Sequence, residues 1–149
     1  MKIRSCIAIW IAFLALPVAA HAALGDTVSS VTADQTKMKA SLASTLKASY
    51  TDNVITNSDG LVVHEYSRAD GTVFAVAWNG PSMPNLRQTL GRYFDGYVAG
   101  AKANRLGHHR LSIQQSDLVI HEAGKMRLFS GVVYVPSLVP SGVDADQLQ

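Results

Sequence analysis

The sequence predicts a single α+β domain in which one long helix packs on a face of an antiparallel sheet of about five strands. Three observations lead to this prediction. β-rich runs are separated by tight-turn signals, an apolar stripe at helical spacing follows the third run, and two more β-rich runs come after it. The expected order is helix, three strands, helix, two strands. The 149 residues suffice for one domain with a core and are too few for two ordinary domains.

The first 22 residues are expected to be a signal peptide and not part of the fold. Two basic residues precede an uninterrupted apolar run from Cys6 to Leu16. Ala20-His21-Ala22 supplies the small residues that a signal peptidase requires, so we expect cleavage between Ala22 and Ala23. The apolar run of 11 residues is too short to span a bilayer, which takes about 20. No membrane span is therefore expected after cleavage.

Removal of this segment changes the charge and the cysteine content. The whole chain has 13 basic and 11 acidic residues, and the loss of Lys2 and Arg4 leaves 11 of each. A neutral mature chain gives no electrostatic reason to expect nucleic acid or an anionic membrane as a partner. The only cysteine, Cys6, also leaves, so the mature chain has no disulfide, no thiolate metal ligand and no thiol nucleophile.

A first helix is expected over Asp34 to Ala48. Met38, Leu42 and Leu46 follow one another at i, i+4 and i+8 among lysines and serines, which is the spacing of a narrow apolar stripe on a helix.

Three β-rich runs come next, over Tyr50 to Thr56, Leu61 to Arg68 and Thr72 to Trp78. The turns between them end in Asp59-Gly60 and Asp70-Gly71, and Asp-Gly supplies the positive backbone angles of tight hairpin turns. The third run contains VFAVAW, the most apolar stretch of the three. It is expected to be the central strand.

A second, longer helix is expected after the proline-containing loop at residues 79–85. Apolar residues recur at helical spacing from Leu86 to Ala101, and Leu106-Gly107 ends the pattern. Three glycines lie within this helix, and each weakens it by up to about 1 kcal/mol relative to alanine.

The remaining chain predicts one more hairpin and a tail. Residues 111–122 and 125–135 are β-rich, and Ala123-Gly124 between them is expected to be the turn. Prolines then stop regular structure. The expected organisation is a signal peptide at 1–22, one domain at 23–140 and a flexible tail at 141–149.

Four histidines remain after the signal, at positions 64, 108, 109 and 121. His64 and His121 lie in expected strands, and if those strands were neighbours the two side chains could form half of a zinc site. The simpler interpretation is two surface histidines, so no metal or other cofactor is expected. His108 and His109 are expected in a solvated turn.

No motif marks a catalytic site. The chain has no Gly-x-Ser-x-Gly elbow, no HExxH motif, no Walker loop and no dinucleotide-binding glycine pattern. Glu65 and Glu122 lie in expected strands among polar residues, where solvated carboxylates are expected. An enzyme, such as a hydrolase, would need a histidine near a carboxylate and a hydroxyl, and His64 and His121 are the candidates.

The segment from Trp78 to Arg87 is the strongest candidate for a binding surface. Tryptophan and arginine often anchor interfaces, and Pro81 and Pro84 stiffen the loop between them. The alternative is that Trp78 caps the core and the prolines only steer the chain from sheet to helix.

The run from Phe74 to Phe94 resembles the central signature of a family of exported bacterial proteins, catalogued as domain of unknown function 2844. Ala23-Leu24-Gly25, Ser116 to Ile120 and Pro140 to Val143 are similar too, so the resemblance covers essentially all of the mature chain. Asn85 stands where the family pattern has aspartate, and either residue can cap a helix. The resemblance implies an exported protein and brings no activity, cofactor or catalytic residue.

Three hypotheses about function follow. The first is a non-enzymatic periplasmic or secreted protein that binds another envelope or secreted protein, which requires an exposed apolar patch near Trp78. The second is a small-ligand binder that uses the space between helix and sheet, which requires a concave cavity with converging polar groups. The third is the small hydrolase with a histidine-carboxylate site.

Overall fold

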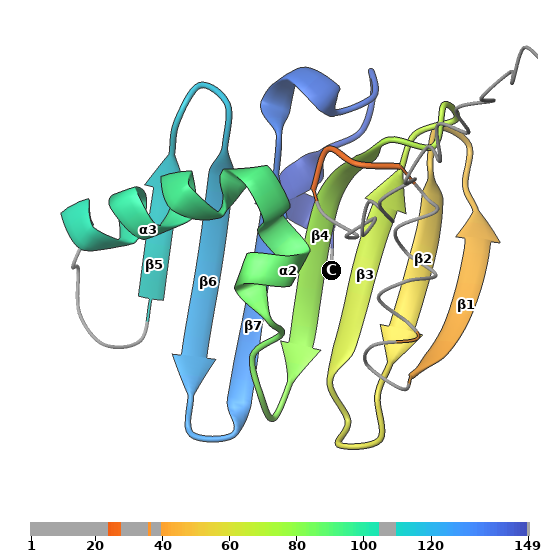
Figure 1. The fold of residues 1–149 in the computed structure, drawn as a ribbon. Coiled ribbons are helices and arrows are strands. Elements are labelled where there is room, and N and C mark those ends of the chain that lie inside the picture. Colours follow the sequence, from red (N-terminus) through yellow and green to blue (C-terminus); the bar gives the residue numbers. More distant parts are fainter. Residues whose placement is uncertain (1–23, 28–35, 37–39, 105–109, 149) are drawn as a thin grey trace, which may run out of the picture.

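The computed structural model describes residues 24–27, 36, 40–104 and 110–148. They form one seven-stranded sheet, antiparallel throughout, in the order β1-β2-β3-β4-β7-β6-β5 (Figure 1). The strands are β1 (Ser41–Leu46), β2 (Thr51–Thr56), β3 (Val62–Ser67), β4 (Val73–Gly80), β5 (Arg110–Gln114), β6 (Val119–Lys125) and β7 (Leu128–Tyr134).

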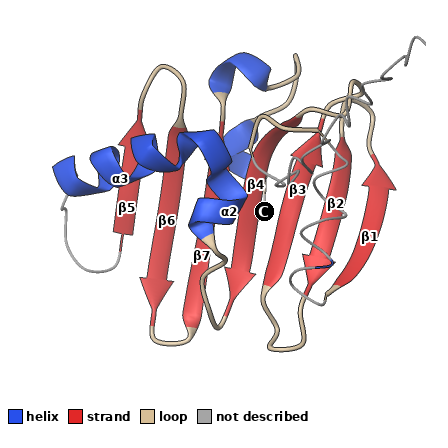
Figure 2. Ribbon diagram, in the orientation of Figure 1, coloured by secondary structure: helices blue, strands red, loops and turns tan. Residues whose placement is uncertain are grey.

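The chain builds the sheet from one edge and then from the other. The first four strands succeed one another as hairpins, and β4, which carries the most apolar run, is the middle strand of the sheet. Helices α2 (Leu86–Leu90) and α3 (Phe94–Ala103) carry the chain across one face toward the far edge. From there β5, β6 and β7 return inward until β7 pairs with β4 (Figure 2).

The main core lies between the sheet and these helices. Val76, Trp78, Ile120 and Val133 belong to it, and the apolar side chains of α2 and α3 pack against them. Contact between α3 and the sheet is close at Gly100, where an added Cβ would lie 2.6 Å from the Ile113 Cδ1 atom. A glycine here therefore lets the helix approach β5.

The opposite face of the sheet carries a second apolar cluster. Tyr66, Phe74 and Ala75 belong to it, and Ala145 and Leu148 from the C-terminal segment pack on them. Both C-terminal side chains are buried. The segment after Pro140 therefore covers part of this face, and the remainder stays open.

The helix predicted over residues 34–48 is wrong at residues 41–46, which form the edge strand β1. Leu42 and Leu46 are four residues apart, a spacing that fits one face of a strand as well as one face of a helix. Pairing with β2 decides between the two, and the Ser44 hydroxyl donates to Asn53 Oδ1 across it at 2.7 Å. Residues 34, 35 and 37–39 of the predicted helix lie outside the described residues.

The prediction of about five strands is also wrong: residues 110–134 form three strands where two were expected, and β1 adds the seventh strand. A turn at Ser116-Asp117 separates β5 from β6, closed by a hydrogen bond from Gln115 N to Leu118 O at 2.9 Å. Gly124 lies inside β6, and the hairpin turns at Met126-Arg127, where Arg127 adopts a φ of 59°.

The second predicted helix is broken near its start. Gly91 has a φ of 50° and ends α2, and a 3₁₀ turn over Gly91–Tyr93 leads into α3. Glycine adopts a positive φ without steric cost, so the helical pattern of the sequence is compatible with this break. No helix among the described residues has the length and apolar character needed to cross a membrane.

Candidate functional site

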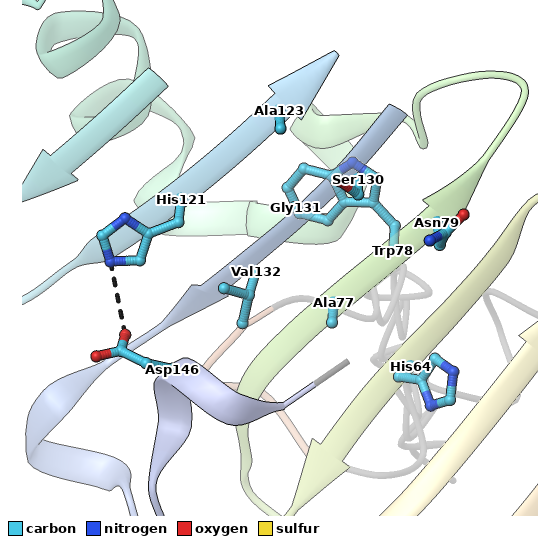
Figure 3. A pocket seen from close by; sticks show the side chains of 10 residues that line it. All are labelled: His64, Ala77, Trp78, Asn79, His121, Ala123, Ser130, Gly131, Val132 and Asp146. Carbon is cyan, nitrogen blue, oxygen red and sulfur yellow. Dashed lines mark ion pairs between the residues drawn. The ribbon is translucent and has the colours of Figure 1, made fainter. Parts of the chain in front are cut away.

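A cavity of about 340 Å³ opens on the face of the sheet opposite the helices (Figure 3). We call it the central hollow. Its floor includes Ala77 and Val132, and the polar groups around them come from β3, β4, β6, β7 and the C-terminal segment: His64, Asn79, His121, Ser130 and Asp146. Ala77 and Val132 have small side chains between larger neighbours, so the surface is depressed above them.

The strand register places the two histidines on opposite sides of this floor. His64 faces Ala77, Ala77 faces Val132, and Val132 faces His121 in one continuous row across the sheet. The row spans three strand spacings, so the two histidines lie roughly 14 Å apart at their backbones. Because β3 and β6 are not neighbours, the condition for a shared metal site is not met. The described residues contain no cluster of three or more metal-ligating side chains.

His64 is held by two neighbours on the same face. Its Nδ1 atom lies 3.0 Å from Asp52 Oδ1, and its ring stacks on Tyr66 with centroids 5.9 Å apart. These two contacts therefore fix the orientation of the His64 imidazole ring. Burial, together with the Asp52 carboxylate, raises the pKa of the Tyr66 hydroxyl far above its ordinary value, so Tyr66 stays neutral.

His121 lies in a chain of polar contacts that ends in the C-terminal segment. Its Nδ1 atom lies 3.1 Å from Ser112 Oγ, and its Nε2 atom lies 3.5 Å from Asp146 Oδ1. The Tyr134 hydroxyl donates to the same Asp146 oxygen at 2.9 Å. Burial and this contact raise the pKa of Tyr134 to about 12. Asp146 thus ties the C-terminal segment to both β6 and β7.

Ser112, His121 and Asp146 are the residue types of a hydrolase triad, but their surroundings do not favour that chemistry. The side chains of His121 and Asp146 are 36% and 59% exposed, and the contact between them is long. An exposed imidazole-carboxylate pair is worth little in water, whereas catalytic groups act in water-excluded sites.

Asn79 and Ser130 are the polar side chains of the hollow that remain available. They face each other across β4 and β7, and neither side chain hydrogen-bonds another described residue. An amide and a hydroxyl offer both donors and acceptors, and neither carries charge. Sequence reasoning named neither residue: Asn79 lies within the segment from Trp78 to Arg87 but is not among its expected contacts, and nothing in the local sequence of Ser130 distinguishes it from other polar residues.

The residues predicted to form a binding surface are only partly at the surface. Trp78 is 3% exposed, and its indole lies over Gly131, where an added Cβ would overlap the ring. Pro84 is buried as well, while Pro81 and Arg87 are exposed.

Arg87 lies beside an aromatic ring and a helix start. Its guanidinium carbon stands 4.4 Å from the centroid of the Phe94 ring. Asn85 caps α2 by accepting a hydrogen bond from Gln88 N at 3.3 Å. Met83, 40% exposed, is the apolar side chain that this loop offers to solvent.

Two carboxylates expected in solvent are instead buried on the helix side of the sheet. Glu65 is 3% exposed. Glu122 is partly buried beneath α3, where the Tyr97 hydroxyl donates to its Oε2 atom at 3.5 Å. Burial raises the pKa of Glu122 to about 7. Glu122 Oε1 and Trp78 Nε1 are buried without a hydrogen-bond partner among the described residues.

The expected signal-cleavage residues, Ala22 and Ala23, lie outside the described residues, and so do His108 and His109.

Fold and site together define a protein built on one antiparallel sheet, with helices on one face and a ligand-sized hollow on the other. The chain belongs to the family described as "Protein of unknown function (DUF2844)", which matches residues 20–148. Neither the curated proteins nor the solved structures include a match to this chain.

Proposed function

We propose that the protein is an exported, non-enzymatic binding protein that holds a small ligand in the central hollow. The observation that carries this proposal is the pair Asn79 and Ser130, whose side chains hydrogen-bond no other described residue and lie beside the apolar floor. The volume of about 340 Å³ is at the lower end of the range for small-molecule sites. A few polar groups around an apolar floor are typical of such sites.

The small-ligand hypothesis therefore replaces partner binding as the leading one. Partner binding through Trp78 would require an accessible indole, and this indole is in the core. The hollow lies on the face opposite the helices, and not between helix and sheet as the sequence suggested.

Loss of the Asn79 amide is expected to weaken ligand binding about tenfold. A library of small neutral polar fragments, titrated into the ¹⁵N-labelled protein, should shift backbone amides of β3, β4, β6 and β7 around the hollow. Asn79→Ala removes one donor-acceptor group that a fragment can hydrogen-bond, which is worth about 1.4 kcal/mol in the affinity of a fragment that uses it.

Thr45→Ala is the matched control, because Thr45 is an exposed polar residue of the edge strand β1, away from the hollow. It should leave fragment affinities unchanged. Shifts that gather elsewhere, or affinities that Asn79→Ala does not change, would contradict the proposal.

Binding of another envelope or secreted protein is the second candidate function. Exposed Met83 and Arg87, which lie in the same segment between β4 and α3, favour it, since methionine and arginine are both enriched at interfaces. Trp78, the anchor expected for this surface, is buried and does not contribute to it.

Export makes a separate prediction. Native mass spectrometry of protein from the expressing cell should give a chain that starts at Ala23. Additional mass that is lost on denaturation would support the ligand proposal and identify the molecule. A chain that still starts at Met1 would contradict export by signal cleavage.

A further inference from the structure

A second cavity adjoins the central hollow on the same face of the sheet. Its volume is about 400 Å³, and we call it the outer hollow. Ala123 and Ser130 line both cavities. The outer hollow is otherwise lined by Arg110, Lys125, Met126 and Leu128, around the turn between β6 and β7.

The register shows why the two cavities are continuous. Arg110 faces Ala123, Ala123 faces Ser130, and Ser130 faces Asn79 in one row. This row lies two residues along the strands from the row of Ala77 and Val132. Ser130 on β7 and Arg110 on β5 are two strand spacings, roughly 10 Å, apart at their backbones. A six-membered ring with one anionic substituent can bridge that distance because the arginine and lysine side chains extend well away from the backbone.

The outer hollow carries unbalanced positive charge. Arg110 and Lys125 both lie on this face of the sheet, and neither forms an ion pair with another described residue. No acidic side chain is among the residues that line it. Diagonal neighbours of this kind have Cβ atoms about 7–8 Å apart, so two long cationic side chains can converge on one anion.

The central hollow has the opposite character. It has no lysine or arginine in its lining. Its one carboxylate, Asp146, is already engaged by His121 and Tyr134. A hydroxyl group can both donate to and accept from Asn79 and Ser130.

We propose that the two hollows form one groove for an elongated ligand with a neutral, hydroxyl-bearing body and an anionic end. The body lies on Ala77 and Val132 and hydrogen-bonds Asn79 and Ser130. The anionic end, a phosphate or a carboxylate, lies between Arg110 and Lys125. This inference rests on the proposed function of the central hollow and specifies the class of its ligand.

Four probes test the groove by amide-shift titration of the full mature chain: glucose, glucose 6-phosphate, glucuronate and inorganic phosphate. At least one of the two anionic sugars is expected to shift amides around both hollows and to bind at least tenfold more tightly than glucose, the usual gain from one charge-assisted contact. Comparison of the two distinguishes a phosphate end from a carboxylate end. Inorganic phosphate is expected to shift amides of the outer hollow alone.

The double variant Arg110→Gln/Lys125→Gln is expected to reduce the affinity for the anionic sugar to that for glucose. Lys102→Gln, which removes an exposed cation from α3 on the other side of the sheet, should leave it unchanged. Circular dichroism checks that the double variant is folded, which is expected because Arg110 and Lys125 are exposed.

The inference fails if neither anionic sugar binds more tightly than glucose, or if the double variant binds both as the parent does. Neutral fragments that still contact Asn79 and Ser130 would then leave the proposed function standing. If those fragments also fail to reach the central hollow, the proposed function fails with it.

Discussion

Trp78→Ala is expected to destabilise the protein by about 3–5 kcal/mol and to lower its melting temperature by more than about 10 °C. Trp78 is 3% exposed and fills the space above Gly131 in the main core, so truncation leaves a large cavity. Thermal and urea unfolding monitored by circular dichroism measure the change. A surface anchor for a partner would show the reverse pattern, with binding lost and stability kept.

Trp78→Phe separates the packing of this ring from its polar atom. The indole N–H is buried without a hydrogen-bond partner among the described residues, and phenylalanine removes that cost while it keeps most of the apolar area. The variant is expected to lose clearly less stability than Trp78→Ala, because the phenyl ring leaves a smaller cavity. A Trp78→Ala variant as stable as the parent would show that Trp78 is not a core residue.

Glu122→Gln is expected to stabilise the protein by up to about 3 kcal/mol at pH 8 and to have little effect at pH 4. Burial raises the pKa of Glu122 from 4.5 to about 7 in the folded protein. Each unit of such a difference corresponds to about 1.4 kcal/mol. Between these two pH values the folded protein binds more protons than the unfolded chain, so its stability falls as the pH rises.

Urea unfolding at several pH values between 4 and 9 tests this prediction. In the parent, the contribution of Glu122 to the free energy of unfolding should fall from about pH 4.5 to about pH 7 and stay constant above that. Glu122→Gln should lack this fall. Asp117→Asn, at an exposed turn between β5 and β6, is the matched control and should retain it. Parallel pH profiles for the parent and Glu122→Gln would show that this carboxylate is solvated.

Only part of the candidate site could be predicted from the local sequence. Histidines 64 and 121 are conspicuous in the sequence, and strand alternation correctly gives each one a defined face. That alternation cannot say which strands are neighbours, so a shared metal site and a separation of three strand spacings are equally compatible with it. Asp146 comes from a segment expected to be a tail, and it reaches His121 only because Ala145 and Leu148 pack on the sheet.

The burial of Glu122 and Trp78 could not be predicted from the sequence for the same reason. Glu122 stands among polar neighbours in the chain, yet α3 covers it, because the sheet face it occupies is the helix face. Trp78 stands next to a loop that contains exposed residues such as Pro81 and Met83, yet its ring turns toward Gly131 on the neighbouring strand. In both cases the covering group is distant in sequence.

The sequence by itself determined the β-rich runs, the hairpin turns at Asp59-Gly60 and Asp70-Gly71, and the central position of the run that became β4. These follow from contacts and backbone angles within a few residues, which local composition encodes. Only the tertiary structure decided that residues 41–46 form a strand, that seven strands pair in the observed order, and that a hollow remains on the face opposite the helices. Those outcomes depend on hydrogen bonds and packing between residues far apart in the chain. The spacing of apolar residues along the chain, whether two or four, does not encode such contacts.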